Sequence, residues 1–338
     1  MHLHSSREGR AMTPSTATAR PRGSHGGRHQ ALLPAITPEP ATHRTVEAVA
    51  RKLVHRTYPR DVLPTGITRH TDEHFTVSVR WPATHPLYLR DGRYTPSLVI
   101  ETVRQAGLLT SHAELGVPLG HQFVVWEISQ HFDPRFLEKA HAPTDLELDV
   151  HVSEMRTRGR IPAEVSLQMA IRIDGRVVGK GSTRYGIVSP GAYRRLRGER
   201  HDIEWPPTDI TLPEPVEPAA VRRTRECDVA LSPDKRPGRW QLRADTANEL
   251  LFDHSNNHVP AMVLLEAALQ AGYPLFGGRP FTASSCEVTC TRYVEFDSPC
   301  WIQADLATGP DGSPSLRVTG EQAQQPAFAV QFHQATPL

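Results

Sequence analysis

Two glutamates recur with a glutamine at the same spacing. Glu101 is followed by Gln105, and Glu266 is followed by Gln270. Residues four apart share one face of an α-helix, so each pair predicts a carboxylate beside an amide. Both pairs lie in strongly apolar stretches, and burying an unpaired ionised carboxylate costs at least several kcal/mol. The pattern therefore indicates a catalytic or ligand-facing acid in each place, or a glutamate paired with an arginine to fix register.

A loop with two histidines precedes the second glutamate. His254 and His258 are four residues apart, and Asp253 is adjacent to the first of them. Either imidazole could act as a general base, alone or together with a glutamate whose pKa is raised by burial. The histidines could also bind a metal ion. No further ligands cluster with them in the sequence, so we predict no metal site.

The elements that must position these side chains are two helices, predicted from Pro96 to about residue 115 and from Pro260 to Gly272. Proline suits the first turn of a helix, where its missing N–H costs nothing. Both helices are apolar on most faces, which predicts that they are buried. Alternating apolar runs around them predict strands. These runs are 53–55, 74–81, 122–128, 145–152, 163–173 and 176–188, and then 227–231, 240–245, 281–295, 300–306, 315–319 and 327–332.

The two halves of the chain repeat each other. Residues 100–107 align with 265–272 without a gap, and Glu, Gln, Ala and Gly coincide. Between the halves, residues 205–218 hold five prolines, which is typical of an extended, unpacked connector. We predict an α+β fold of two tandem copies, in which antiparallel sheets wrap a helix. The predicted parts are a disordered tail (1–45), a first domain (46–200), a proline-rich linker (201–220) and a second domain (221–338).

Composition limits the classes of function. The 338 residues carry a net charge of +1, which gives no strong case for binding nucleic acid or an anionic membrane. No apolar run approaches the roughly 20 residues that span a bilayer. Four cysteines are too few for a disulfide scaffold, which favours a reducing compartment. We therefore predict a cytoplasmic protein.

A set of short motifs, in order along the chain, resembles the A-factor biosynthesis (AfsA-type) family of tandem hotdog proteins. Each motif is weak alone, whereas the ordered set is specific. The motifs are Leu53-Val-His-Arg, Asp61-Val-Leu-Pro-Thr-Gly, Glu101-Thr-Val-Arg-Gln-Ala-Gly, Gly116-Val-Pro-Leu-Gly-His-Gln-Phe, Tyr193-Arg-Arg-Leu-Arg-Gly, Phe252-Asp-His, His258-Val-Pro and Arg292-Tyr-Val-Glu-Phe-Asp-Ser-Pro-Cys-Trp.

This resemblance implies an acyltransferase that moves a 3-oxoacyl chain from acyl carrier protein to the hydroxyl of dihydroxyacetone phosphate. That reaction begins the synthesis of a γ-butyrolactone signal controlling secondary metabolism, and it needs no cofactor. The family's important glutamates fall on Glu101 and Glu266. Two positions depart from the family pattern: Leu269 replaces an arginine, and Ala261 replaces a glycine. The alternatives are another hotdog thioester enzyme, such as a dehydratase or thioesterase, and a non-catalytic ligand-binding homologue.

The resemblance also suggests where substrates bind. We expect Arg104 and Arg292 to bind the phosphate, unless they are solvated surface arginines. Gln105 and Gln270 are the other expected substrate contacts, and backbone N–H groups at the helix starts are candidate oxyanion donors. By analogy with hotdog dimers, His254 would serve a site containing Glu101. The basic run 193–200 either meets acyl carrier protein or is a solvated helix end, and the oligomeric state is left open.

Overall fold

The computed structural model describes residues 49–90, 92–138, 142–207, 211–277, 283–309 and 312–334. The predicted disordered tail lies outside these residues. The first half contains β1 (Pro64–Arg69), β2 (His74–Trp81), β3 (Leu89–Arg90), β4 (Arg93–Tyr94), α1 (Pro96–Ala113), β5 (Gln122–Phe132), β6 (Thr144–Arg158), β7 (Ile161–Ile173), β8 (Arg176–Val188) and α2 (Pro190–Arg197). The second half contains β9 (Leu231–Pro233), β10 (Arg239–Leu242), α3 (Ala261–Leu275), β11 (Ala283–Cys290), β12 (Cys300–Thr308), β13 (Pro314–Gln322) and β14 (Gln325–Gln334).

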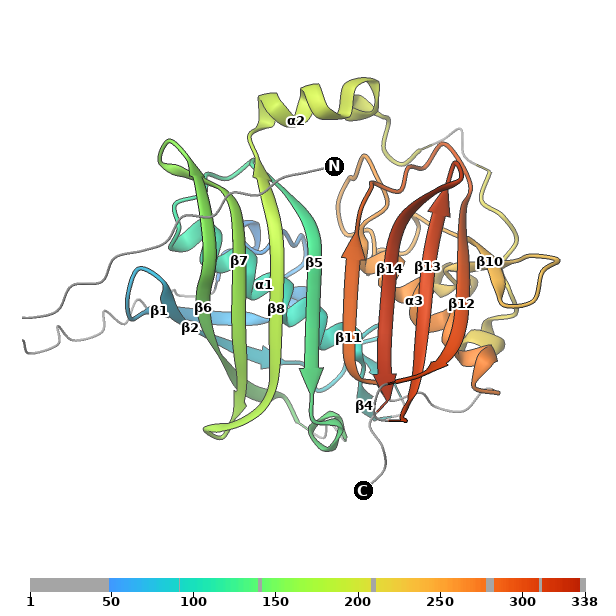
Figure 1. Cartoon of the computed structure of the whole chain (residues 1–338), viewed down its shortest axis with the longest axis horizontal. Coiled ribbons are helices and arrows are strands. Elements are labelled where there is room, and N and C mark those ends of the chain that lie inside the picture. Colours follow the sequence, from blue (N-terminus) through green and yellow to red (C-terminus); the bar gives the residue numbers. More distant parts are fainter. Residues whose placement is uncertain are drawn as a thin grey trace, which may run out of the picture. The chain divides into compact units, whose positions relative to one another are not determined.

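Twelve of these strands form one antiparallel sheet whose order is symmetric about its centre. Outward from the central β5–β11 pair, the order is β5-β8-β7-β6-β2-β1 on one side and β11-β14-β13-β12-β10-β9 on the other. Each half therefore repeats the same strand order around its own helix, α1 or α3 (Figure 1). The predicted α+β class and internal repeat are confirmed.

Alternation in the strands explains why one face of the sheet holds the core. In β2, Phe75, Val77 and Val79 are buried, whereas the residues between them are half-buried on the other face. Side chains on a strand point alternately to its two faces, so this pattern leaves one apolar face for the helix. The predicted tight hairpin is also confirmed, because Asp174 and Gly175 join β7 to β8 with φ of 48° and 74°.

The two long helices are buried against this sheet, as predicted. The helix α1 contacts β5 and β8, and α3 contacts β12 and β13. The repeated glycine has a packing reason in the second copy. A Cβ atom on Gly272 would lie 2.6 Å from Cδ2 of Leu316, so α3 approaches β13 closely enough to exclude a side chain there.

Four of the predicted strands are wrong wholly or in part, and one of these, expected over 240–245, ends at Leu242. In the run 53–55, Leu53 is the last residue of a 3-10 turn (Arg51–Leu53). His55 has a φ of 52°, which is outside the range of β-strands. Residues 226–228 form a second such turn, so that strand begins only at Leu231. The strand expected over 281–295 ends at Cys290, and its first two residues lie outside the described part of the chain. Short apolar runs do not distinguish strands from turns that bury one side chain.

The proline-rich connector packs against the second copy, so the expectation of an unpacked segment is wrong. Trp205 contacts the rings of Phe252 and Phe296, with centroids 5.9 and 6.0 Å apart. Val216 donates its backbone N–H to the carbonyl oxygen of Leu231 at 3.0 Å. Apolar residues among the prolines account for this packing, and the domain boundaries stay a prediction.

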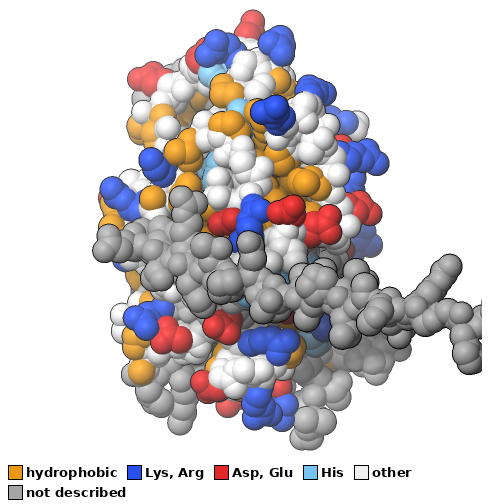
Figure 2. Space-filling model, turned by 90° about the vertical axis from the view of Figure 1, so that its left-hand side faces the viewer, with side chains coloured by type: hydrophobic (Ala, Val, Ile, Leu, Met, Phe, Trp, Pro, Cys, Tyr) orange, Lys and Arg blue, Asp and Glu red, His pale blue; other side chains and the backbone are white. Residues whose placement is uncertain are grey.

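The surface of the first copy carries mixed charge. Basic and acidic side chains are interspersed there with hydrophobic and histidine side chains (Figure 2). Among the described helices, none combines the length and apolarity required to cross a bilayer.

Candidate functional site

Glu101 is a fully buried carboxylate enclosed by two arginines. Its oxygens accept hydrogen bonds from Arg104 at 2.7 and 2.8 Å, from Arg56 at 3.0 Å and from Gln105 at 2.6 Å. Burial alone would raise the pKa of Glu101, but the charges of Arg104 and Arg56 outweigh burial and lower it to about 2. The predicted raised pKa of Glu101 is therefore wrong, whereas its catalytic role stays a prediction.

The glutamine beside each glutamate joins the helix to a neighbouring backbone segment. Gln105 accepts from the N–H of Leu63 at 2.9 Å and donates to the carbonyl of Asp61 at 2.7 Å. In the second copy, Gln270 makes the equivalent bonds at 2.8 Å each. These contacts give both glutamines a positioning role, and substrate binding by either one stays a prediction.

Glu266 has a similar but not identical environment. It accepts from Gln270 at 2.7 Å and pairs closely with Arg223, the counterpart of Arg56. Leu269 occupies the position that Arg104 has in the first copy and is buried in the core. A second guanidinium instead comes from the first copy, where Arg90 lies 3.6 Å from the carboxylate. The two acids therefore differ in how their second arginine is supplied.

Arg56 and Arg223 contact the two buried glutamates, and the sequence analysis did not name either arginine as a site residue. They precede their glutamates by 45 and 43 residues, outside the helices that we compared. A signal was nevertheless present: the pattern Arg-Thr-x-x-x-Asp-Val stands at residues 56–62 and again at 223–229. A search for repeats outside the helices would have found both arginines.

His254 is held by a buried aspartate next to it. One oxygen of Asp253 accepts from Nδ1 of His254, and the other accepts from the N–H of Thr57 at 3.0 Å. Burial would raise the pKa of Asp253, but the hydrogen bond from His254 and the charge of Arg56 lower it to about 2. Because an ionised carboxylate only accepts, Nδ1 of His254 carries a proton, and in the neutral form of this imidazole the lone pair is on Nε2.

His258 is a neutral imidazole beside this dyad. Burial, together with the charges of Arg197 and His254, lowers its pKa to about 3. Its Nδ1 lies 3.0 Å from Oδ1 of Asn257, which also accepts from the hydroxyl of Tyr193 at 2.7 Å. An amide oxygen only accepts, so Nδ1 of His258 donates and its Nε2 is also a lone-pair acceptor.

A cavity of about 280 Å³ between the two copies brings four of the eight predicted site residues together. The first copy contributes Arg104, and the second contributes His254, His258 and Arg292. Its apolar wall consists of residues from β5, α3 and the loop before it: Phe123, Val124, Val125, Val259, Met262 and Leu264. An adjoining cavity of about 470 Å³ shares both histidines. Neither lining includes Glu101, which lies behind the two arginines.

The cavity directly beside Glu266 is small. It measures about 10 Å³, is lined partly by Arg90 and Arg223, and adjoins a cavity of about 460 Å³. A further cavity of about 680 Å³ lies beside the connector, and no histidine lines it. Among the described residues, His254 and His258 thus line the space between the copies, and a shared site for His254 and Glu101 stays a prediction.

Buried histidines at this site should make the fold sensitive to acid. Burial lowers the pKa of both His55 and His258 to about 3. Between about pH 6.5 and pH 3 the unfolded chain therefore binds protons that the folded chain does not, and stability falls as pH falls. Each such histidine contributes a slope of about 1.4 kcal/mol per pH unit. Urea unfolding measured at several pH values above pH 5 would give this slope.

A variant separates these histidines from other acid-sensitive groups. The change His55→Asn with His258→Asn should make the slope shallower, and asparagine tolerates the positive φ of residue 55. Glu101 and Asp253, whose pKa values are lowered to about 2, contribute stability that is lost only as pH falls below about 4. An unchanged slope above pH 5 in the double variant would contradict the assignment.

Comparison with known proteins agrees with this geometry. A family model described as the A-factor biosynthesis hotdog domain matches residues 38–189 and 206–335. A protein of Streptomyces virginiae named 2-oxo-3-(phosphooxy)propyl 3-oxoalkanoate synthase is 40% identical over 284 residues, which are 83% of this chain and 95% of that protein. A Streptomyces coelicolor protein of the same name is 37% identical over 282 residues, covering 82% and 89% of the two chains.

A solved structure shares the fold. The structure, described as an oleoyl thioesterase from Lactobacillus plantarum, superposes with a TM-score of 0.52 at 13% identity, covering 78% of this chain and 97% of that one. At this identity the likeness concerns architecture alone.

Proposed function

The chain belongs to the A-factor biosynthesis hotdog family, and we propose that it is a 2-oxo-3-(phosphooxy)propyl 3-oxoalkanoate synthase. Its two tandem copies are hotdog domains. In the proposed reaction, a 3-oxoacyl group passes from acyl carrier protein to the hydroxyl of dihydroxyacetone phosphate, which begins γ-butyrolactone synthesis. One observation carries the site assignment: the Asp253–His254 dyad faces a cavity that Arg104 and Arg292 also line.

The dyad supplies the base for this transfer. The lone pair on Nε2 of His254 takes the hydroxyl proton as the oxygen attacks the thioester carbon. A C–O bond forms, the C–S bond breaks, and the departing thiolate receives the proton back from the imidazole. A positioned base of this kind contributes about 10²–10⁴-fold. Backbone N–H groups of Ala261 and Met262, at the start of α3 and in the cavity wall, are the proposed oxyanion donors.

Glu101 acts through other residues in this scheme. It binds Arg56, and Arg56 lies 3.5 Å from Asp253, which holds His254. A continuous chain of charges therefore runs from α1 of the first copy to the imidazole of the second. We assign Glu101 a positioning role, because it fixes the arginine that in turn fixes the dyad.

The cavity divides into a polar and an apolar part that suit the two substrates. Arg292 is exposed at its edge and is the proposed phosphate contact, with Arg104 nearby. Phe123, Met262 and Leu264 form an apolar wall suited to an acyl chain.

The departures from the family pattern leave this site intact. Leu269 lies in the core of the second copy, away from the lining of the cavity, and Ala261 is a small residue in its wall. Neither removes an imidazole or an arginine from the space between the copies. The position of these two residues gives no reason to prefer a non-catalytic role.

Product analysis distinguishes the synthase from the alternatives. Purified protein would be incubated with a 3-oxoacyl carrier protein, with and without dihydroxyacetone phosphate, and all products identified by mass. A phosphorylated 3-oxoalkanoate ester that appears only with the acceptor supports the synthase. Release of free acid regardless of acceptor would instead identify a thioesterase, and an unchanged thioester in both incubations would indicate a non-catalytic protein.

The helix α2 offers a basic surface for an acidic carrier protein. Arg194 and Arg195 are exposed, and Leu196 between basic residues is 60% exposed. Tyr193 and Arg197 anchor the opposite side of α2 to Asn257, near the histidine loop. Figure 1 shows α2 extending from the end of β8 toward the second copy. We place carrier docking here, and this partner together with four unpaired cysteines favours a cytoplasmic reaction.

Charge reversal on α2 should weaken use of the carrier alone. Arg194→Glu with Arg195→Glu should raise the KM for a carrier-linked donor by about tenfold or more, because like charges at an interface repel. The KM for a pantetheine-linked donor should not change. Arg158→Glu with Arg160→Glu, at the exposed β6–β7 turn, is the matched control. An equal loss with both donors, or an equal loss in the control, would exclude docking on α2.

A further inference from the structure

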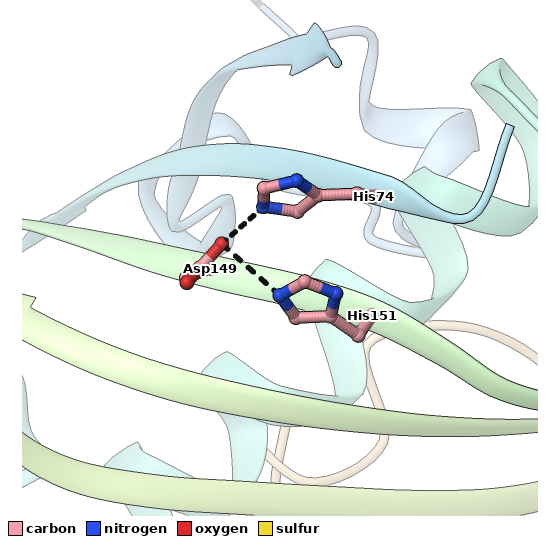
Figure 3. A group of neighbouring side chains, drawn as sticks. All are labelled: His74, Asp149 and His151. Carbon is pink, nitrogen blue, oxygen red and sulfur yellow. Dashed lines mark hydrogen bonds and ion pairs between the residues drawn. The ribbon is translucent and has the colours of Figure 1, made fainter. Parts of the chain in front are cut away.

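Three side chains that bind metal ions well meet on the outer face of the first copy. His74 lies at the start of β2, and Asp149 and His151 lie on β6, the neighbouring strand. The pairing of the two strands places His74 directly opposite His151, with Asp149 two residues along. Figure 3 shows Asp149 between the two imidazoles, with one oxygen directed at a nitrogen of each. The strand register therefore brings two imidazoles and a carboxylate to one place.

The distances between these atoms suit a small cation. Nε2 of His74 lies 2.5 Å from Oδ1 of Asp149, and Nε2 of His151 lies 3.5 Å from the same oxygen. All three candidate ligand atoms fall within 4.8 Å of one another. Nitrogen and oxygen ligands at about 2.0–2.1 Å from a tetrahedral Zn²⁺ lie roughly 3.3 Å apart, so small side-chain rotations bring the three atoms onto one ion.

The side chains have the freedom that such rotations need. The imidazoles of His74 and His151 now stack, with ring centroids 4.1 Å apart, and must turn to point both Nε2 atoms at one ion. Their side chains are 33% and 53% exposed, so part of each imidazole borders solvent, into which it can turn. The backbone, by contrast, is fixed in a paired region of the sheet, which holds the ligands close together.

Two further side chains, those of His70 and Arg172, lie next to this cluster. His70, in the turn before β2, lies with its ring 4.6 Å from that of His74 and is bonded to Thr76. Arg172, on β7, is also near Asp149, and its Nη1 donates to the carbonyl of Gly175. His70 thus provides a third imidazole close to the cluster. The guanidinium of Arg172 is held by a hydrogen bond within the β7–β8 turn.

We propose that His74, Asp149 and His151 form a binding site for a divalent transition-metal ion, with zinc as the ion that fits this ligand set best. Two imidazoles and a carboxylate are borderline ligands that favour zinc over calcium or magnesium. Bound zinc would replace the contacts that the two imidazoles now make with the carboxylate. It would link β2 to β6 and stabilise the outer part of the first sheet.

This site is separate from the transfer reaction. None of the three residues lines the cavity between the copies. Removing the metal should therefore leave the transfer rate unchanged while lowering the melting temperature, because an ion that binds only the folded state stabilises it. A failure of the proposed synthase activity would leave the metal proposal unaffected, and the reverse also holds.

The test is calorimetric titration of the full chain with Zn²⁺ after dialysis against a chelator. The chain holds 18 histidines, and histidines outside the cluster can also bind zinc. The informative quantity is therefore the difference in zinc stoichiometry between wild type and variant. Wild type should bind one more zinc equivalent than the variant His74→Ala with His151→Ala, and zinc should raise the melting temperature of the wild type but not of that variant. The control is His131→Ala with His333→Ala, two histidines on strands that flank β11.

Further measurements keep this test decisive. If the double variant fails to fold, Asp149→Asn removes one ligand with little change in shape and should also lose the equivalent. Cobalt added to wild type should give a visible absorption band typical of low coordination, absent in the variants. Equal zinc stoichiometry in wild type and a folded variant would overturn the proposal, as would loss of the same equivalent in the control.

Discussion

Replacing His254 with alanine is expected to lower the rate of acyl transfer by about 10²–10⁴-fold, the usual contribution of a positioned general base. The side chain is 47% exposed, so its removal should leave the free energy of unfolding nearly unchanged. The measurement is kcat for product formation with saturating donor and acceptor. His131→Ala, which truncates an exposed histidine on β5, should keep wild-type activity.

The aspartate beside His254 gives a second readout of the same claim. Asp253→Asn keeps the size of the side chain but removes the charge that holds the imidazole. The rate should fall, because an amide nitrogen facing Nδ1 favours the wrong tautomer. Wild-type kcat in either His254→Ala or Asp253→Asn would exclude the dyad as the base. His258 would then be the next candidate for the base.

The second large effect is expected from the two buried glutamates, which should behave differently. Glu101→Gln leaves Arg56 and Arg104 buried without their anion, and breaking a buried pair in this way costs about 3–5 kcal/mol. Glu266→Gln should cost a comparable amount, since Arg223 loses its partner. Only Glu101→Gln should also lower kcat in the protein that remains folded, because only Glu101 is connected to Asp253.

Two measurements separate stability from activity in these variants. Urea unfolding gives the loss of stability, and kcat determined well below the melting temperature gives the effect on the folded enzyme. Full kcat in Glu101→Gln would show that the positioning chain is unimportant. An equal loss of kcat in Glu101→Gln and Glu266→Gln would instead indicate two working sites, despite the small cavity beside Glu266.

Local patterns predicted the core of this fold well. Proline, an apolar surface and a Glu–Gln pair identified both buried helices, and alternation gave β2 and β8 at their observed bounds. The errors fall where a single buried side chain lies on a turn, as at residues 53–55, or where apolar residues pack a proline-rich segment such as Trp205. Such contacts depend on tertiary neighbours that local periodicity does not contain.

Four of the residues predicted for the site line one cavity, and their roles stay predictions. The analogy with paired hotdog units placed His254 in a site with Glu101, but Glu101 is not in the lining of this cavity. The ionisation of Glu101 was predicted wrongly because Arg56 is 45 residues away and enters only through folding. The His74–Asp149–His151 cluster escaped detection for the same reason, since strand register joins residues 75 positions apart.

The central claim is that one site, built from both copies, performs the transfer. The most direct test is a crystal structure with an amide analogue of 3-oxoacyl-pantetheine, in which nitrogen replaces the thioester sulfur. We expect one analogue per chain, its amide carbon beside Nε2 of His254 and its acyl chain against Met262 and Phe123. Density beside Glu266 instead, or an analogue bound outside the space between the copies, would contradict the account.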